Sequence, residues 1–315
     1  MRLGRVLWLW VCLFMPVLSW AACDAVNETG PIHGKSVLVT GFPFLQAQQA
    51  RWGSVQGLEV RTPQLIADAI NGTSGHRALD LSHTQVRANS LDQQYYADQY
   101  PRSATRWEAL DLPDSQFVLT GIIEDVSADQ KQSLSWPTRY ARNVLGLVNK
   151  RYDQPRHLAI LVELINRYTG DLVWRHRYVR QGNWSLKSNE KVAVDGSRFW
   201  QSSYGREWMI ALDQLVEDVN TVLDCEPYMT RVAEVTHQGF FINANSKTNI
   251  QLGDYFYMAK LGNAGPYAPA DTSRLSGVYI RATVIGVTPF GVQARVLPAD
   301  QGKVRIGDLV MLNQG

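Results

Sequence analysis

The hydrophobic pattern of this 315-residue chain changes at Glu226-Pro227, and this change limits what the chain can fold into. Before that point, short apolar runs typical of strands are mixed with a longer stretch of helical periodicity. After it, nearly every apolar run has the length and β-branched content of a strand. The sequence therefore predicts an α+β (α/β) segment, with helices on a mixed sheet, followed by an all-β segment.

Strands are expected at four places in the first segment. Residues 36–42 and 117–126 are short apolar runs rich in β-branched side chains. Residues 157–165 and 172–179 flank a turn-rich link, which predicts a β-hairpin.

Two helices are expected in the same segment. Residues 64–70 predict a short helix with Pro63 near its first turn and Asn71-Gly72 after its end. Residues 208–223 predict a longer helix whose apolar side chains gather on one face. These side chains are Ile210, Leu212, Leu215, Val216, Val219, Val222 and Leu223.

The second segment contains a short repeat. Residues 249–258 resemble residues 303–312, because in both an apolar residue precedes Gly-Asp and an apolar run follows. Glycine allows a positive φ and Asp can bond its own turn, so each copy predicts a tight entry into a strand. Two such entries among several strands suggest a small β-barrel. The strands expected are 232–235, 240–244, 254–260, 278–287 and 292–296, with a Gly/Pro-rich loop at 262–272 that is either mobile or used for contacts.

The N-terminus has the pattern of a secretory signal peptide. Arg2 and Arg5 precede the apolar run 6–18, and the small-residue exit 19–21 follows. Thirteen residues make a helix of roughly 20 Å, which is shorter than the ~30 Å hydrocarbon core of a bilayer. We therefore expect residues 1–21 to be removed on export, leaving an α/β domain at 22–227 and a β-barrel domain at 228–315.

Charge limits the classes of partner. Residues 1–21 hold two arginines and no acidic residue, so the rest of the chain has 29 basic and 29 acidic residues. A chain without net positive charge lacks the electrostatic signature of a nucleic-acid-binding protein. No later apolar run is long enough to cross a bilayer, so we expect no transmembrane segment in the mature chain.

Two cysteines remain after export, Cys23 and Cys225. In an oxidising compartment such a pair favours a disulfide, which would link the new N-terminus to the end of the first segment. The alternative is a lipoprotein, in which Cys23 is acylated after cleavage at Ala22. Trp20 argues against acylation, because lipobox sequences usually carry Leu there. The sequence favours the disulfide and leaves the alternative open.

Residues that could perform chemistry are not arranged for it. His157 and His176 lie on the expected hairpin and could face each other, but two histidines on an amphipathic sheet are more often structural than metal-binding. Ser188 and Lys191 fit the S-x-x-K pattern, although the stretch shows no helical periodicity and no K-T-G follows. We therefore expect no enzymatic activity, no catalytic residue, no bound metal and no cofactor.

Aromatic and basic side chains are concentrated in two places instead. Residues 174–180 alternate Trp174, His176 and Tyr178 with Arg175, Arg177 and Val179. Residues 199–208 gather four aromatic side chains before the long helix. Trp, Tyr and Arg are enriched where proteins bind one another, although aromatics can equally cap a sheet. The candidates for contact with a partner are Trp174, Arg175, Arg177, Tyr178, Arg180, Phe199, Trp200 and Tyr204.

Several short strings, in this order along the chain, resemble the flagellar assembly protein T family, the periplasmic H-ring proteins of sodium-driven polar flagella. They are Lys35-Ser-Val-Leu-Val-Thr-Gly-Phe-Pro43 with residues 48–50, Glu163-Leu164 before residues 169–174, Phe199-Trp200 with Tyr204-Gly205, and Cys225-Glu-Pro227 before the Gly-Asp repeat. The resemblance covers roughly residues 23–315. It implies a TolB N-terminal-like α/β middle domain and a small C-terminal barrel like that of rotary ATP synthase head subunits.

The resemblance also implies a location and partners. It indicates a structural subunit in the periplasm, at the flagellar basal body and in possible association with the outer membrane. Its partners would be the LP ring, other H-ring or T-ring components, and further copies of itself. The family's best-known member carries an additional N-terminal domain linked to T-ring placement, so the resemblance supports ring building more directly than stator recruitment. The alternative function is a periplasmic carrier or scaffold in envelope biogenesis that binds a lipoprotein or polymer.

Overall fold

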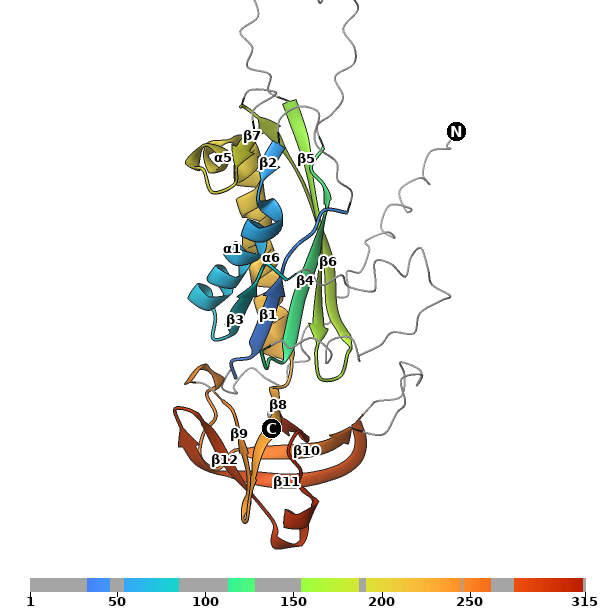
Figure 1. The fold of residues 1–315 in the computed structure, drawn as a ribbon, viewed down its shortest axis with the longest axis vertical. Coiled ribbons are helices and arrows are strands. Elements are labelled where there is room, and N and C mark those ends of the chain that lie inside the picture. Colours follow the sequence, from blue (N-terminus) through green and yellow to red (C-terminus); the bar gives the residue numbers. More distant parts are fainter. Residues whose placement is uncertain are drawn as a thin grey trace, which may run out of the picture. The chain divides into compact units, whose positions relative to one another are not determined.

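The structure is a computed structural model that describes residues 33–45, 54–84, 113–127, 154–186, 191–244, 246–261 and 275–313 (Figure 1). Among these residues no helix is both long and apolar enough to span a membrane. The expected signal sequence, Cys23 and the expected loop at 262–272 lie outside the described residues.

A five-stranded mixed sheet forms the centre of the first segment, in the order β3-β1-β4-β5-β6 (Figure 1). β1 pairs in parallel with both β3 and β4, whereas β4, β5 and β6 form an antiparallel meander. The strands are β1 (Ser36–Thr40), β3 (Arg77–Leu81), β4 (Phe117–Asp125), β5 (Gln154–Asn166) and β6 (Leu172–Trp184). A smaller parallel pair joins β2 (Ser54–Gln56) to β7 (Lys191–Ala193).

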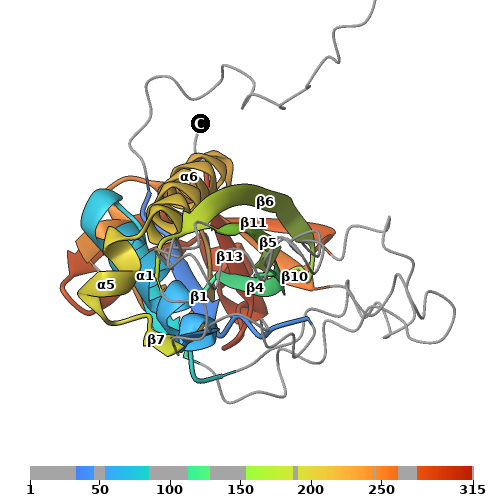
Figure 2. The ribbon, with the colours of Figure 1, turned by 90° about the horizontal axis from the view of Figure 1, so that it is seen from above.

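Helices α1 (Leu58–Thr73) and α6 (Ser203–Cys225) pack on one face of this sheet, and α5 (Ser197–Gln201) precedes α6 (Figure 2). Alternate side chains of β1, β4 and β5 point toward the helices because successive residues of a strand face opposite sides. Val39, Leu119 and Ile160 are among these residues, and each is fully buried in the core against α1 and α6.

α1 begins six residues before the expected start, so Pro63 lies inside the helix rather than near its first turn. Proline removes the bond that its N–H would donate to the carbonyl four residues earlier. That carbonyl belongs to Glu59, and it accepts a hydrogen bond from the Phe42 backbone N–H at 3.0 Å instead. The loop after β1 thus satisfies the group that Pro63 leaves free.

α6 also begins earlier than expected, at Ser203 rather than residue 208. Ser202 caps it, because its side chain accepts a hydrogen bond from the Gly205 N–H at 2.9 Å. The expectation that Ile210 belongs to the apolar face is wrong, since this side chain is 45% exposed. At 3.6 residues per turn, Ile210 lies roughly 160° around the helix from buried Leu212.

The second segment is a closed six-stranded barrel in the order β10-β11-β12-β9-β8-β13. Its strands are β8 (Met229–Thr236), β9 (Gly239–Ile242), β10 (Tyr255–Leu261), β11 (Leu275–Thr288), β12 (Gly291–Val296) and β13 (Leu309–Leu312), with short 3-10 turns η2 (Ser246–Thr248) and η3 (Pro298–Lys303). A mixed α+β segment followed by a small β-barrel confirms the expected fold class. The separation into two domains at residue 227 remains a prediction.

The two Gly-Asp copies form the same turn. Gly253 and Gly307 have φ values of 94° and 86°, which L side chains rarely adopt. In each copy the Asp side chain accepts a hydrogen bond from the backbone N–H three residues earlier, at 2.7 Å for Asp254 and 2.8 Å for Asp308. Each glycine N–H then bonds a strand of the other copy, at the carbonyl of Val284 or Val232. The repeated sequence therefore specifies a repeated structure.

This equivalence extends through the barrel. A Cβ at Gly239 would lie 2.0 Å from the Ala294 carbonyl oxygen, and one at Gly291 would lie 2.3 Å from that of Ile242. Register shifts follow Val232 in the pairing of β8 with β9 and Val284 in the pairing of β11 with β12. The barrel thus consists of two copies of one unit, with β8, β9 and β10 corresponding to β11, β12 and β13.

Candidate interaction surface

The β5–β6 hairpin places the two sets of alternating residues on opposite faces of the sheet. Trp174, His176 and Tyr178 pair with Leu164, Val162 and Ile160, on the face that carries the helices. Arg175, Arg177 and Val179 pair with Glu163, Leu161 and Ala159, on the other face. The expected alternation is therefore present in the structure.

On the face with the helices, the aromatic side chains form a ladder beside α6. The rings of Trp174 and His176 are stacked with centroids 6.0 Å apart, and His176 and Tyr178 are 4.6 Å apart. The Tyr178 hydroxyl donates a hydrogen bond to Asp218 at 2.6 Å. Burial, together with this carboxylate, raises the pKa of Tyr178 above its ordinary value. Tyr178 therefore links the sheet to the helix and is not available to a partner.

On the opposite face, two arginines are paired with acids of neighbouring strands. Arg175 Nε donates to Glu163 at 2.6 Å, and Arg177 Nε donates to Glu124 at 2.5 Å. The Glu163 side chain is 1% exposed, whereas that of Glu124 is 18% exposed. Arg175 and Arg177 remain accessible, but their charges are compensated within the chain.

Arg180 extends from β6 toward α6, where its Nη2 donates to the Gln214 side chain at 2.9 Å. Arg156 of β5 lies over the ring of Trp184, 3.8 Å from its centroid. Arg156 is almost fully enclosed, and this burial lowers its pKa to about 10. The guanidinium group stacks on the Trp184 ring as a cation–π contact. The hairpin therefore encloses Arg156 inside the fold, whereas Arg180 is bonded at the surface.

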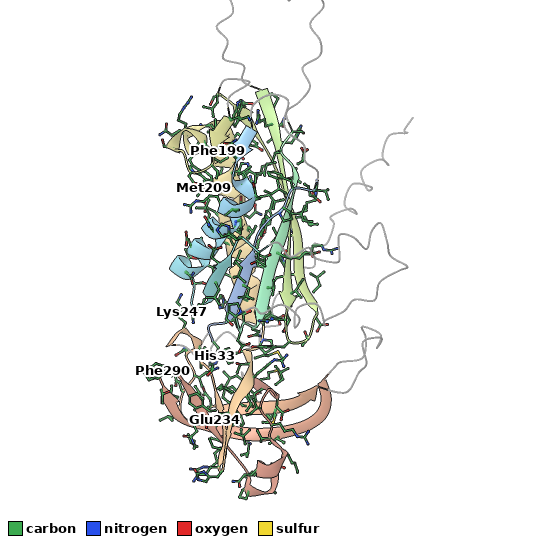
Figure 3. All side chains as sticks on the ribbon, viewed as in Figure 1. His33, Phe199, Met209, Glu234, Lys247 and Phe290 are labelled. Atoms are coloured by element: carbon green, nitrogen blue, oxygen red, sulfur yellow. The ribbon has the colours of Figure 1, made fainter. Side chains whose placement is uncertain are left out.

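The aromatic residues before α6 mostly belong to the core. Phe199 comes from α5 (Figure 3) and packs edge-on to Trp200 and to Tyr204. Phe199 and Tyr204 are fully buried, and the Tyr204 hydroxyl donates to the His157 carbonyl at 2.9 Å. Burial raises the pKa of Tyr204.

Three of the eight candidates for contact with a partner are buried in the structure. Tyr178, Phe199 and Tyr204 are buried, because the sheet needs large apolar groups where α5 and α6 cover it, and they cannot contact a partner in this fold. Trp174, Arg175, Arg177, Arg180 and Trp200 are at least partly accessible. For these five residues, a role in binding remains a prediction.

The histidines of the hairpin and Cys225 were also singled out in the sequence. His157 pairs with Gln181 and His176 with Val162, so the two histidines do not face each other. Within the described ranges, no three His, Cys, Asp or Glu side chains are grouped as they would be around a metal ion. Cys225 is the last residue of α6. Because Cys23 lies outside the described residues, its pairing with Cys225 remains a prediction.

Two features were missed by the sequence reasoning. Lys35 is 1% exposed, and its Nζ has no hydrogen-bond partner among the described residues. Burial lowers its pKa to about 8, against the opposing effect of Asp224 and Glu226.

The outer wall of the barrel also carries aromatic and basic side chains on β10, β11 and β12. The period-two alternation of residues 292–296 could have revealed part of that wall.

Comparison with known proteins gives a family. The family model of the flagellar assembly protein T middle domain matches residues 31–194, which is more than half of the chain. No curated protein matches this chain in sequence.

The solved structures that match this chain have low sequence identity to it and low TM-scores. The hypothetical protein CT253 from Chlamydia trachomatis is 12% identical with a TM-score of 0.37, and the match covers 60% of this chain and 98% of that protein. A PelC dodecamer from Paraburkholderia phytofirmans is 13% identical with a TM-score of 0.30, covering 62% and 94%. TolB from Acinetobacter baumannii is 11% identical with a TM-score of 0.23, covering 85% and 39%.

At these scores the structural likenesses carry no argument about function, so the assignment depends on the family match. That match begins just before β1 and ends after β7, so it includes the whole mixed sheet. The chain belongs to the flagellar assembly protein T family.

Proposed function

We propose that this protein is a non-enzymatic structural component of the bacterial flagellar basal body, an H-ring type subunit in the periplasm. In this role it surrounds the LP ring and supports assembly of the outer rings and motility. The observation that carries the proposal is the match of residues 31–194 to the flagellar assembly protein T middle domain. The N-terminal export pattern agrees with a periplasmic location.

A subunit of a closed ring needs two different patches, one for each neighbour, because head-to-tail contacts close a ring. The remaining contact candidates offer one such patch. Trp174 and His176 form a stacked edge of the ladder, and Arg180 lies on the same strand. In the proposed role these side chains bind ring proteins and carry out no chemical step.

The test is a deletion strain examined for swimming and, by electron cryotomography, for the outer basal-body rings. We expect both to be lost and to return when the wild-type chain is supplied from a plasmid. Complementation with a Trp174→Ala/Arg180→Ala variant then tests the patch, and we expect reduced swimming with normal protein levels.

Intact rings and normal swimming in the deletion strain would rule out this function. If the chain then co-purified with transport or Tol-like proteins rather than rod-ring proteins, it would instead be a carrier or scaffold in envelope biogenesis.

A further inference from the structure

The barrel has one outer wall that is rich in aromatic and basic side chains. Phe256, Met258, Ala282, Val284 and Ala294 point into the barrel, so the residues between them point outward. These outward residues include Tyr255, Tyr257, Arg281 and Arg295, which together are called the barrel wall.

The charges of the barrel wall are not balanced by any described neighbour. Arg281 stacks on Tyr255, with its guanidinium carbon 3.7 Å from the ring centroid, and this contact holds the cation in place. Arg281 and Arg295 are both exposed, and neither forms an ion pair with a described residue. None of the outward residues described on β10, β11 and β12 is acidic. The barrel wall is therefore a positively charged surface with an ordered aromatic component.

The internal repeat shows what such a wall can do. The corresponding wall of the other copy carries Met229, Arg231, Leu309 and Met311. Met229 and Leu309 pack with Tyr168, and Arg231 lies over the Tyr168 ring at 5.4 Å. One wall is thus already used to bind the β5–β6 turn of the same chain. In the equivalent wall, Arg281 and Arg295 have no such contact with another element in the part of the chain that the structure describes.

α6 carries the opposite charge. It contains five acidic residues and one basic residue. Asp218 is bonded to Tyr178, and Asp224 lies 3.1 Å from His76, so these two are engaged. Asp213 and Glu217 are exposed, and within the described ranges their carboxylates form no ion pair.

Asp213 and Glu217 share a helix face with Ile210, which is 45% exposed, and Met209 (Figure 3) lies beside it at 37% exposed. Ile210, Asp213 and Glu217 are called the α6 stripe. It combines an uncovered apolar side chain with two exposed acids, and the exposed Arg206 lies one turn before Ile210, at the end of this face away from Glu217. The part formed by Ile210, Asp213 and Glu217 has the composition expected of a surface that binds a basic and aromatic patch.

The spacings of the two surfaces also agree. Asp213 and Glu217 are four residues apart on a helix, which places them about 6 Å apart along its axis. Arg295 is opposite Thr283, two residues from Arg281 on the adjacent strand. This register separates the two arginines by about 8 Å. Two ion pairs can therefore form together between flexible side chains.

We propose that the barrel wall of one copy binds the α6 stripe of a second copy, so that this chain assembles head to tail. This contact would join neighbouring subunits of the ring, and its biological role rests on the function proposed above. Because the two patches differ, the contact is heterologous, and the subunit at either end of an assembly keeps one unused patch.

The experiment is sedimentation velocity of the purified chain over a concentration series at low and high salt. We expect concentration-dependent association that salt weakens, since screening reduces attraction between exposed charges. Arg281→Glu/Arg295→Glu and Asp213→Lys/Glu217→Lys should each weaken it at least about tenfold. Arg77→Glu/Arg305→Glu is the matched control, because it changes charge equally at exposed sites outside the barrel wall and should have no such effect.

Two further samples test the pairing itself. A mixture of the two charge-reversed variants has two competent interfaces, the native pair of patches and the reversed pair, so it should associate in alternating assemblies although neither variant associates alone. Combining all four substitutions in one chain should restore assembly. Circular dichroism verifies folding, and Arg281→Gln/Arg295→Gln replaces the first variant if that one unfolds.

A wild-type chain that stays monomeric at every concentration would overturn the inference. The same conclusion follows if the barrel-wall variant associates like wild type, or if the fourfold variant fails to assemble. These outcomes are separate from the motility test, because loss of rings in the deletion strain with no self-association through these patches would leave the proposed function standing.

Discussion

The Tyr178 hydroxyl donates a 2.6 Å hydrogen bond to the Asp218 carboxylate, joining the edge strand of the sheet to the middle of α6. Tyr178 is 3% exposed and also stacks in the ladder with His176. The residue that looked suited to a partner contact therefore holds two elements of its own chain together.

Tyr178→Phe should destabilise the fold by about 1–2 kcal/mol, because it removes a bond to a charged acceptor and leaves the ring in place. Urea denaturation of the variant, of Asp218→Asn and of the double variant measures the coupling. Tyr255→Phe is the control, since the exposed Tyr255 hydroxyl has no hydrogen bond among the described residues, and it should change stability by less than about 0.5 kcal/mol. Equal losses for both tyrosines would contradict the assignment.

Lys35→Met should stabilise the protein at pH 7. Burial lowers the pKa of Lys35 from 10.5 to about 8, so below pH 8 the folded chain carries a buried charge at a cost of up to about 3 kcal/mol. Between pH 8 and 10.5 the unfolded state binds more protons than the folded state, so the contribution of Lys35 to stability improves as pH rises. The advantage of the variant should therefore shrink over that interval.

The measurement is the difference in urea-unfolding free energy between wild type and Lys35→Met at several pH values, which cancels other titrating groups. Lys303→Met, at an exposed lysine paired with Asp300, is the control and should show no comparable trend. An advantage that is independent of pH would mean that Lys35 is not buried as a cation.

Gly253→Ala and Gly307→Ala should each cost about 1–2 kcal/mol, because both glycines have a positive φ. A methyl group added at either position would meet no atom within 4 Å beyond its chain neighbours, so the cost is conformational rather than steric. Gly302→Ala is the matched control, with equally open space and no positive φ. Thermal unfolding compares the three, and similar losses at 253 and 307 are required by the structural repeat.

Arg175→Ala should be more damaging than Arg177→Ala. Removing Arg175 leaves the Glu163 carboxylate, 1% exposed, without this cation, and we expect a loss of about 2–4 kcal/mol. Glu124 is more accessible and Arg177 is 54% exposed, so breaking that pair should cost less than about 1 kcal/mol. Chemical denaturation ranks the variants, and the reverse order would be inconsistent with the burial of Glu163.

Local patterns in the sequence predicted β1, β4, β5, β6, the barrel strands and the repeat, but they missed the short strands β2, β3 and β7. Period-two alternation at 174–179 identified the two faces of β6, and Gly-Asp at 253–254 and 307–308 identified two turns whose geometry glycine alone adopts easily. The start of each long helix was not predicted correctly. α1 extends through Pro63 because Phe42, a distant residue in sequence, bonds the carbonyl that Pro63 leaves free.

The sequence by itself determined the long strands of the sheet, the change to an all-β pattern after Pro227 and the composition of the aromatic and basic segments, because these depend on neighbours along the chain. Tertiary structure decided which aromatics are covered, since α5 and α6 bury Phe199 and Tyr204 while leaving Trp200 partly exposed. It also decided that the charges of Arg175 and Arg177 are compensated, while those of Arg281 and Arg295 are not balanced by any described residue. Burial and pairing depend on residues far apart in sequence, and only folding brings those residues together.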